Sequence, residues 1–133
     1  MRAGAYNITC EQGSTFVRLI EVEQPDLITD PTGETYEPFN LAGYTARMQA
    51  RRTIESTSFF LMLTTENGGL SINPGDADNE ILIYIEDEVT ASINSSNPGS
   101  NLNGVYDLEI INPSGEVSRL LEGTFTLKAE VTR

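Results

Sequence analysis

Carboxylates dominate the reactive side chains of this sequence, and histidine is absent. The 133 residues include 20 acidic and 8 basic side chains, which give a formal net charge of -12. Without histidine, Ser-His-Asp triads and most general-base schemes are excluded. Asp107 and Glu109 could form an acid–base pair of the kind that glycosidases use. Because they alternate with apolar residues, we expect both on the solvated face of a strand, and we predict that the protein is not an enzyme.

One spacing raises the question of a metal site. Asp76, Asp78, Glu80 and Asp87 occupy positions that resemble those of a calcium-binding loop. However, Ile81 stands where such a loop needs its glycine, and strands rather than helices are expected on either side. We therefore predict a solvated hairpin tip with no bound metal. The sequence also lacks the glycine-rich motifs that bind nucleotide cofactors, so we expect no cofactor.

A short basic segment is the strongest candidate for a binding site. Arg47, Arg51 and Arg52 are three of the eight basic residues and lie within six positions of one another. On a strongly acidic protein, they could contact an acidic partner. The alternative is that they balance carboxylates on neighbouring strands. We predict partner binding at these three arginines, with the balancing role left open.

The acidic balance bears on partners and compartment. A surface of this charge repels phosphate backbones and anionic membranes, so neither nucleic acid nor a membrane is an expected partner. Cys10 is the only cysteine, and it shares strand parity with Tyr6 and Ile8, which favours a buried thiol. No apolar segment resembles a signal peptide or a membrane span. We therefore expect synthesis in a reducing cytoplasm.

Short runs of alternating polarity recur along the chain and are separated by turn residues. This pattern predicts a single all-β domain over residues 1–133, an antiparallel β-sandwich of about seven to nine strands. A small barrel is the second possibility. Parity along the strongest runs predicts a shared core. The predicted core residues are Tyr44, Met48, Phe59, Leu61, Ile83, Tyr106, Leu108, Phe125 and Leu127.

Several segments depart from simple alternation. Residues 14–23 are apolar on both faces, which indicates a central strand or one half-buried under a partner. Residues 86–93 have helical spacing and should form one short helical turn, capped by Asp87. Residues 94–103 should form a flexible polar loop. The adjacent Leu120 and Leu121 indicate a bulge or a two-sided strand.

Longer phrases resemble a known family. They are "YNITCEQGSTF" near the start, "LAGYTARMQARRTIES", "LTTENGGLSI", "YDLEIINPSGEVSRLLEG" and the final "AEVTR". Together they resemble a family of small tailed-phage virion proteins, similar to the N-terminal domain of phage baseplate upper proteins. The resemblance spans nearly the whole chain. It departs from the family pattern at the loop before "YDLE", which is longer here.

The resemblance implies an immunoglobulin-like β-sandwich and a place in the virion. It implies a non-enzymatic structural protein of the phage tail that acts at the baseplate or where fibres attach. Its partners would be other virion proteins, with several copies in each particle. A neck or head-to-tail connector, a capsid decoration protein, and a receptor- or sugar-binding module of a tail fibre remain as alternatives.

Overall fold

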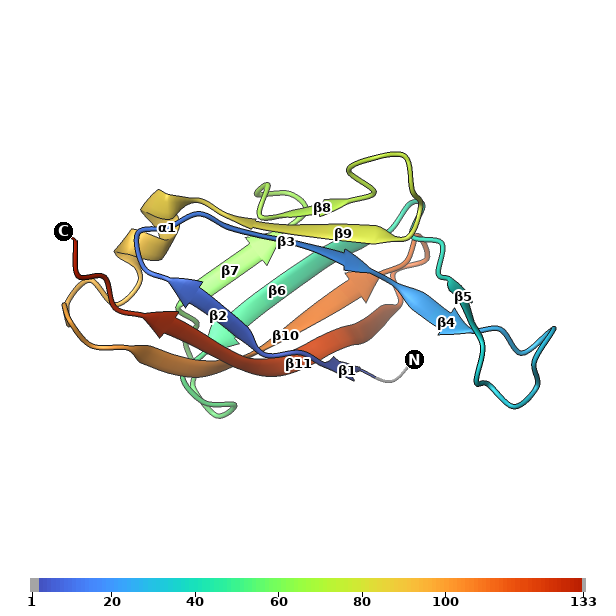
Figure 1. The fold of residues 1–133 in the computed structure, drawn as a ribbon, viewed down its shortest axis with the longest axis horizontal. Coiled ribbons are helices and arrows are strands. Elements are labelled where there is room, and N and C mark those ends of the chain that lie inside the picture. The colour runs from blue at the N-terminus through green and yellow to red at the C-terminus, as the bar shows by residue number, and fades with distance from the viewer. Residues whose placement is uncertain (1–2, 133) are drawn as a thin grey trace.

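The computed structural model describes residues 3–132, which form an all-β structure with one short helix (Figure 1). Met1, Arg2 and Arg133 of the predicted domain lie outside the described residues. In chain order the elements are β1 (Gly4–Ala5), β2 (Ile8–Glu11), β3 (Phe16–Glu21), β4 (Glu23–Pro25), β5 (Tyr36–Pro38), β6 (Thr45–Arg51), β7 (Leu61–Thr64), β8 (Leu70–Ile72), β9 (Glu80–Ile85), α1 (Asp87–Ser92), β10 (Leu102–Ile111) and β11 (Val117–Lys128). The described strands outnumber the seven to nine predicted, because short segments such as β1, β4 and β5 also pair.

Two sheets face each other across one core. The larger sheet has the order β1-β11-β10-β6-β7, with β2 also paired to β11, and the smaller has the order β3-β9-β8. Strands β4 and β5 form a separate hairpin that projects from one end (Figure 1). The pairing is antiparallel except that β1 and β2 run parallel to β11. The predicted all-β class is therefore confirmed.

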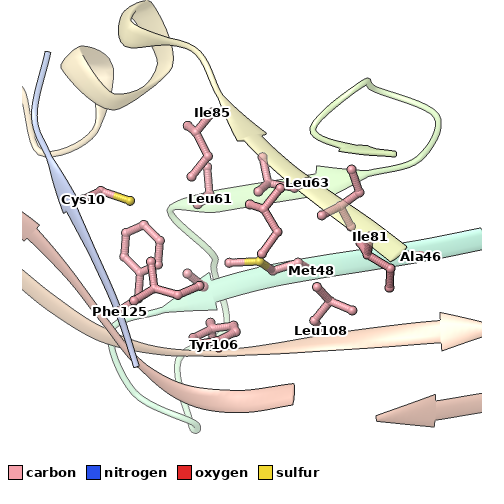
Figure 2. Close-up of a cluster of buried hydrophobic side chains, with 14 of the residues drawn as sticks. Cys10, Ala46, Met48, Leu61, Leu63, Ile81, Ile85, Tyr106, Leu108 and Phe125 are labelled. Atoms are coloured by element: carbon pink, nitrogen blue, oxygen red, sulfur yellow. The ribbon is translucent and has the colours of Figure 1, made fainter. Parts of the chain in front are cut away.

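The core lies between the inward faces of both sheets. Met48, Leu108 and Phe125 from the larger sheet meet Ile81 and Ile85 from the smaller one (Figure 2). Alternate burial along β6 and β10 matches the period of two that a strand imposes. The large apolar side chains of these strands are thus removed from water together, which is the main stabilising contribution to such a fold.

The core prediction is correct for all but one residue. Tyr44 is partly buried and packs against the core, and the other predicted residues are buried apart from Phe59. Phe59 is 46% exposed, and its neighbour Phe60 packs edge-on to Phe125 instead, with 5.7 Å between ring centres. The prediction failed because β7 begins only at Leu61, so strand parity does not extend back to residue 59.

Strand β3 occupies an edge and is not central. It pairs with β9 on one side only, and Val17 and Leu19 on its outer face are exposed. Of the two explanations for its two-sided apolar character, the central position is therefore wrong. A position half-buried under a partner stays open.

The closing hairpin contains the bulge suggested by two adjacent leucines. Leu108 on β10 pairs with Leu121, but the next residue, Glu109, pairs with Arg119. Leu120 is the extra residue, and its side chain is buried. The bulge lets β11 turn consecutive leucines towards the interior while the rest of the strand keeps its alternation.

The helix forms where it was expected, but with different contacts. Helix α1 spans Asp87–Ser92, its N-cap residue is Glu86, and no side chain caps it, so the cap assigned to Asp87 is wrong. Thr90 is the buried residue of the helix. The polar loop that follows is shorter than the predicted 94–103, because β10 already begins at Leu102.

Two buried polar groups belong to this framework. The Tyr106 hydroxyl donates a hydrogen bond to the carbonyl of Tyr6, which ties β10 to the segment between β1 and β2. Cys10 is buried as predicted, and burial raises the pKa of its thiol to about 12, so the reactive thiolate is disfavoured. No helix within residues 3–132 is long and apolar enough to cross a membrane.

Candidate partner-binding face

Two of the three predicted arginines lie at one face of the larger sheet. Arg47 and Arg51 point outward from β6, since the inward positions of that strand are taken by alanine and methionine. Arg52 follows the end of the strand. The outward side chains of β6, β10 and β11 form a surface that we call the mixed-charge face. Its members are Arg47, Gln49, Arg51, Asp107, Glu109, Arg119 and Glu122.

Arg47 is paired across the sheet. It lies directly opposite Glu109 on β10, and its Nε donates to Glu109 Oε1 at 2.8 Å. The arginine side chain is 54% exposed, so the pair contributes only about 0.2–1 kcal/mol to folding. Arg47 thus balances a carboxylate, as the alternative explanation predicted, while much of its guanidinium stays accessible.

Arg51 holds the loop that follows its own strand. Its guanidinium donates to the carbonyl of Ser56 at 2.9 Å and to Gln49 Oε1 at 2.8 Å. It also lies 6.0 Å from the ring centre of Phe59, within range of a cation–π contact. Arg51 therefore orders residues 52–60, and a partner contact would compete with these interactions.

Within the described residues, Arg52 makes the fewest polar contacts of the three arginines. Its side chain is exposed and forms no hydrogen bond or ion pair with any residue from 3 to 132. The three arginines thus differ in their contacts within residues 3–132. Arg47 forms an ion pair, Arg51 binds the loop after its strand, and Arg52 forms neither kind of contact. Of the three, Arg52 has the most donors available for an acidic partner, since a guanidinium carries five.

A further arginine escaped the sequence prediction. Arg119 on β11 lies 3.4 Å from Asp107 Oδ2 and 3.7 Å from Glu122 Oε2. Its place beside Asp107 depends on the register shift at Leu120. The pair of adjacent leucines was the available signal, but the sequence did not say which leucine is the extra residue.

The charge of Asp107 on this face is not fully compensated. Burial raises the pKa of Asp107, and the negative charges of Glu109 and Glu122 raise it further, against the opposing effect of Arg119 and Arg47. The causes that favour the neutral acid therefore outweigh those that favour the carboxylate. An added cation near Asp107 would reverse that balance.

An open groove of about 630 Å³ runs along the mixed-charge face. Its lining combines the charged side chains with Val105 and with Ile54, whose side chain is largely exposed. Ile54 belongs to the loop that Arg51 orders. The groove therefore offers one apolar contact surrounded by charges of both signs, a composition that suits a protein surface.

Comparisons with known proteins assign no relative. No protein-family model matches the sequence, and no curated protein matches it. The phage family named above therefore remains a resemblance, and the function is argued from that resemblance and from the geometry of the face.

The acidic segment between β8 and β9 is the one whose spacing resembles a calcium-binding loop. It forms a turn and contributes no residue to the mixed-charge face. Asp76 and Asp78 are exposed, and the Asp78 carbonyl accepts a hydrogen bond from the Leu41 amide at 2.8 Å. Within residues 3–132, no three carboxylate, cysteine or histidine side chains are grouped so as to hold a metal ion. That calcium does not bind here stays a prediction for calorimetric titration.

Proposed function

We propose that this protein is a non-enzymatic structural component of a phage tail, an adaptor at the baseplate or at the attachment of fibres. In this role it joins the distal tail to another virion protein and is present in several copies per particle. The motifs that resemble the baseplate family support the proposal. It places the protein in the virion, after synthesis in the host cytoplasm.

The observation that carries the proposal is how two of these motifs come together. Residues 41–56 contain β6, and residues 106–123 contain the larger parts of β10 and β11. Although β6 is far from the β10–β11 hairpin in the chain, the three strands are neighbours in the order β11-β10-β6. The two longest motifs of the resemblance thus build one continuous surface, the mixed-charge face. A structural protein needs such a surface to meet its neighbours.

We also propose that the fold is immunoglobulin-like. In that family, strands B, E and D share one sheet, and G, F, C and C′ share the other. The order β3-β9-β8 and the order β11-β10-β6-β7 follow the same scheme, with α1 between the strands equivalent to E and F. This agreement in strand order supports the proposal.

The competing roles find less support. Sugar-binding sites generally present exposed aromatic rings in a shared hollow. Tyr36, Phe59 and Tyr84 are exposed here, but they lie on β5, on the loop before β7 and on β9. The mixed-charge groove contains none of these three rings. A connector or decoration role predicts another place in the particle, which the following experiment distinguishes.

The test is to locate the chain in purified particles of the phage that encodes it, by mass spectrometry and cryo-electron microscopy. We expect several symmetry-related copies at the distal tail. Density at the neck or on the capsid would support the connector or decoration role instead. Particles that lack the protein would rule out a structural role.

Charge-neutralising variants test the predicted arginines that are accessible to a partner. Arg47→Gln and Arg52→Gln, alone and combined, should fold normally, because the one ion pair they remove is exposed. We expect less protein incorporated into particles, and least with the double variant. Ser114→Glu is the control, since it changes the net charge by the same amount as either single variant but lies in the β10–β11 turn, outside the mixed-charge face. Equal incorporation of all variants would remove these arginines from the proposal.

A further inference from the structure

A second candidate surface lies on the outer face of the smaller sheet. Val17 on β3 stands opposite Tyr84 on β9, and Leu19 stands opposite Leu82. Val17, Leu19 and Tyr84 are 53%, 47% and 40% exposed. We call these four residues the apolar strip. Two adjacent cross-strand pairs of large apolar side chains on a solvent-facing sheet differ from isolated surface hydrophobes, which are common.

The apolar surface continues into a hollow at one end. A groove of about 250 Å³ is lined by Tyr84 together with Met62 and Val89, both of which are also exposed. The groove lies between β7, the turn before β8 and the start of α1. The strip therefore ends at a recess in which an apolar side chain could be received.

Carboxylates lie at both ends of the strip. Glu21 stands directly opposite Glu80 at one end, on the same outward face. Like charges in this arrangement are destabilising. At the other end Glu86 lines the groove, and Glu88 follows on α1.

No basic residue compensates these carboxylates within the described part of the chain. The three ion pairs of residues 3–132 all belong to the mixed-charge face. Arg18 is on β3, but its guanidinium lies 5.7 Å from the ring centre of Phe16 and 6.0 Å from that of Tyr6, on the opposite side of the strand from Val17 and Leu19. The strip is therefore apolar in the middle and negative at its ends.

We propose that the apolar strip binds an extended segment of a partner protein, with alternate apolar side chains and a lysine or arginine at each end. Glu80 and Glu86 are six residues apart, which corresponds to about 20 Å along a strand. A partner segment would match them with basic residues about six positions apart. This inference concerns a different face from the arginines and does not depend on the virion proposal.

A second copy of this chain is a poorer occupant. In either orientation it would bring the carboxylates at the ends of one strip towards those of the other, and the strip supplies no cation to offset the repulsion. A partner of the opposite charge gains from the contact that a second copy would lose. The strip also accounts for the two-sided apolar pattern of residues 14–23, as a strand half-buried under a partner.

The probe is a blocked heptapeptide, Lys-Thr-Leu-Thr-Leu-Thr-Lys, titrated into the isotope-labelled protein at low ionic strength. Chemical-shift changes of backbone amides map the contact. We expect saturable changes in β3, β9 and around the groove. A peptide with serine in place of leucine keeps the charges, and one with glutamate in place of lysine keeps the apolar residues. We expect neither control peptide to produce these changes, because binding requires both the leucine side chains and the lysine charges.

Variants of the protein complete the test. Val17→Thr combined with Leu19→Thr should weaken binding of the lysine–leucine peptide by about tenfold or more, because it removes most of the apolar contact on β3. Val117→Thr is the control, since Val117 is similarly exposed on β11 but belongs to the other sheet. It should bind as the wild type does.

Other outcomes would overturn the inference. They are equal binding of the serine peptide, shifts confined to the mixed-charge face, undiminished binding by the Val17–Leu19 variant, or no saturable shift at millimolar peptide. Concentration-dependent dimerisation through the strip, seen by sedimentation and abolished in the same variant, would assign the strip to a second copy instead.

Discussion

The side chains that the sequence predicted for the core differ sharply in burial, and we expect Leu108 and Phe59 to differ most in their contribution to stability. Leu108 has no exposed surface, whereas Phe59 is 46% exposed. Leu108→Ala should lower the free energy of unfolding by about 2–5 kcal/mol, since it removes buried methyl groups and leaves a cavity. Phe59→Ala is the matched control and should cost much less. Denaturant titration of both variants checks this, and similar losses would mean that the burial difference is wrong.

Asp107 is the residue whose charge state should affect stability. Its pKa is raised by burial and by Glu109 and Glu122, so the folded chain holds a proton there more tightly than the unfolded chain does. Stability from this group is therefore present at low pH and is lost as pH rises from the usual carboxyl range through the raised pKa.

Asp107→Asn should therefore be slightly more stable than the wild type at neutral pH. Because the side chain is 39% exposed, solvent screening limits the gain to under about 0.5 kcal/mol. The advantage should shrink towards about pH 3, where the aspartate is largely protonated in both states. Thermal melts at both pH values test the sign. A variant less stable at neutral pH would show that the pairing with Arg119 outweighs the repulsion.

At the scale of elements, a small polar cluster joins the helix to the turn between β2 and β3. The Thr90 hydroxyl accepts a hydrogen bond from the Gly13 amide at 3.0 Å and lies 2.9 Å from the Ser14 carbonyl, to which it can donate. Gln12 donates to the Ile93 carbonyl at 3.0 Å. These contacts close one end of the two-sheet structure.

Thr90→Val should remove the contacts of this hydroxyl with almost no change in volume. We expect a loss of about 0.5–1.5 kcal/mol, because the part-buried hydrogen bonds of this hydroxyl with the Gly13 amide and the Ser14 carbonyl are lost. Thr126→Val is the control, since the Thr126 hydroxyl makes only an exposed contact with Asn103. Chemical denaturation measures both variants, and equal effects would show that the cluster does not contribute to stability.

At the scale of the whole molecule, the charge is unevenly distributed. The described ion pairs lie on the outer face of the larger sheet, while the outer face of the smaller sheet carries carboxylates and apolar side chains. The two faces therefore suit different partners, one bearing groups of both signs and one with a basic rim. Such an arrangement fits a protein that joins two neighbours.

The net charge of -12 should make stability sensitive to salt. Self-repulsion of an acidic chain weakens the compact state, and salt screens it. Raising sodium chloride from low to physiological concentration should raise the melting temperature by a few degrees in calorimetry. A fall would indicate that the exposed ion pairs of the mixed-charge face outweigh the repulsion.

The local sequence pattern was sufficient to predict much of the secondary structure and core of this protein. Alternation along 44–52, 80–85 and 106–111 determined the strands, their inward faces and most of the core, because side-chain direction in a strand depends only on parity. Adjacent leucines indicated the bulge, and helical spacing indicated α1. The same parity placed Asp107 and Glu109 on an outward face.

Only the tertiary structure decided which strands are neighbours. The edge position of β3, the pairing of Arg47 with Glu109 and the place of Arg119 all follow from strand order and register, which depend on contacts between distant residues. The loss of Phe59 from the core has a related cause, since a strand's start is determined by where its partner begins to pair. The apolar strip followed the same division: the sequence determined that residues 14–23 are apolar on both faces, and the fold decided that one of those faces meets solvent.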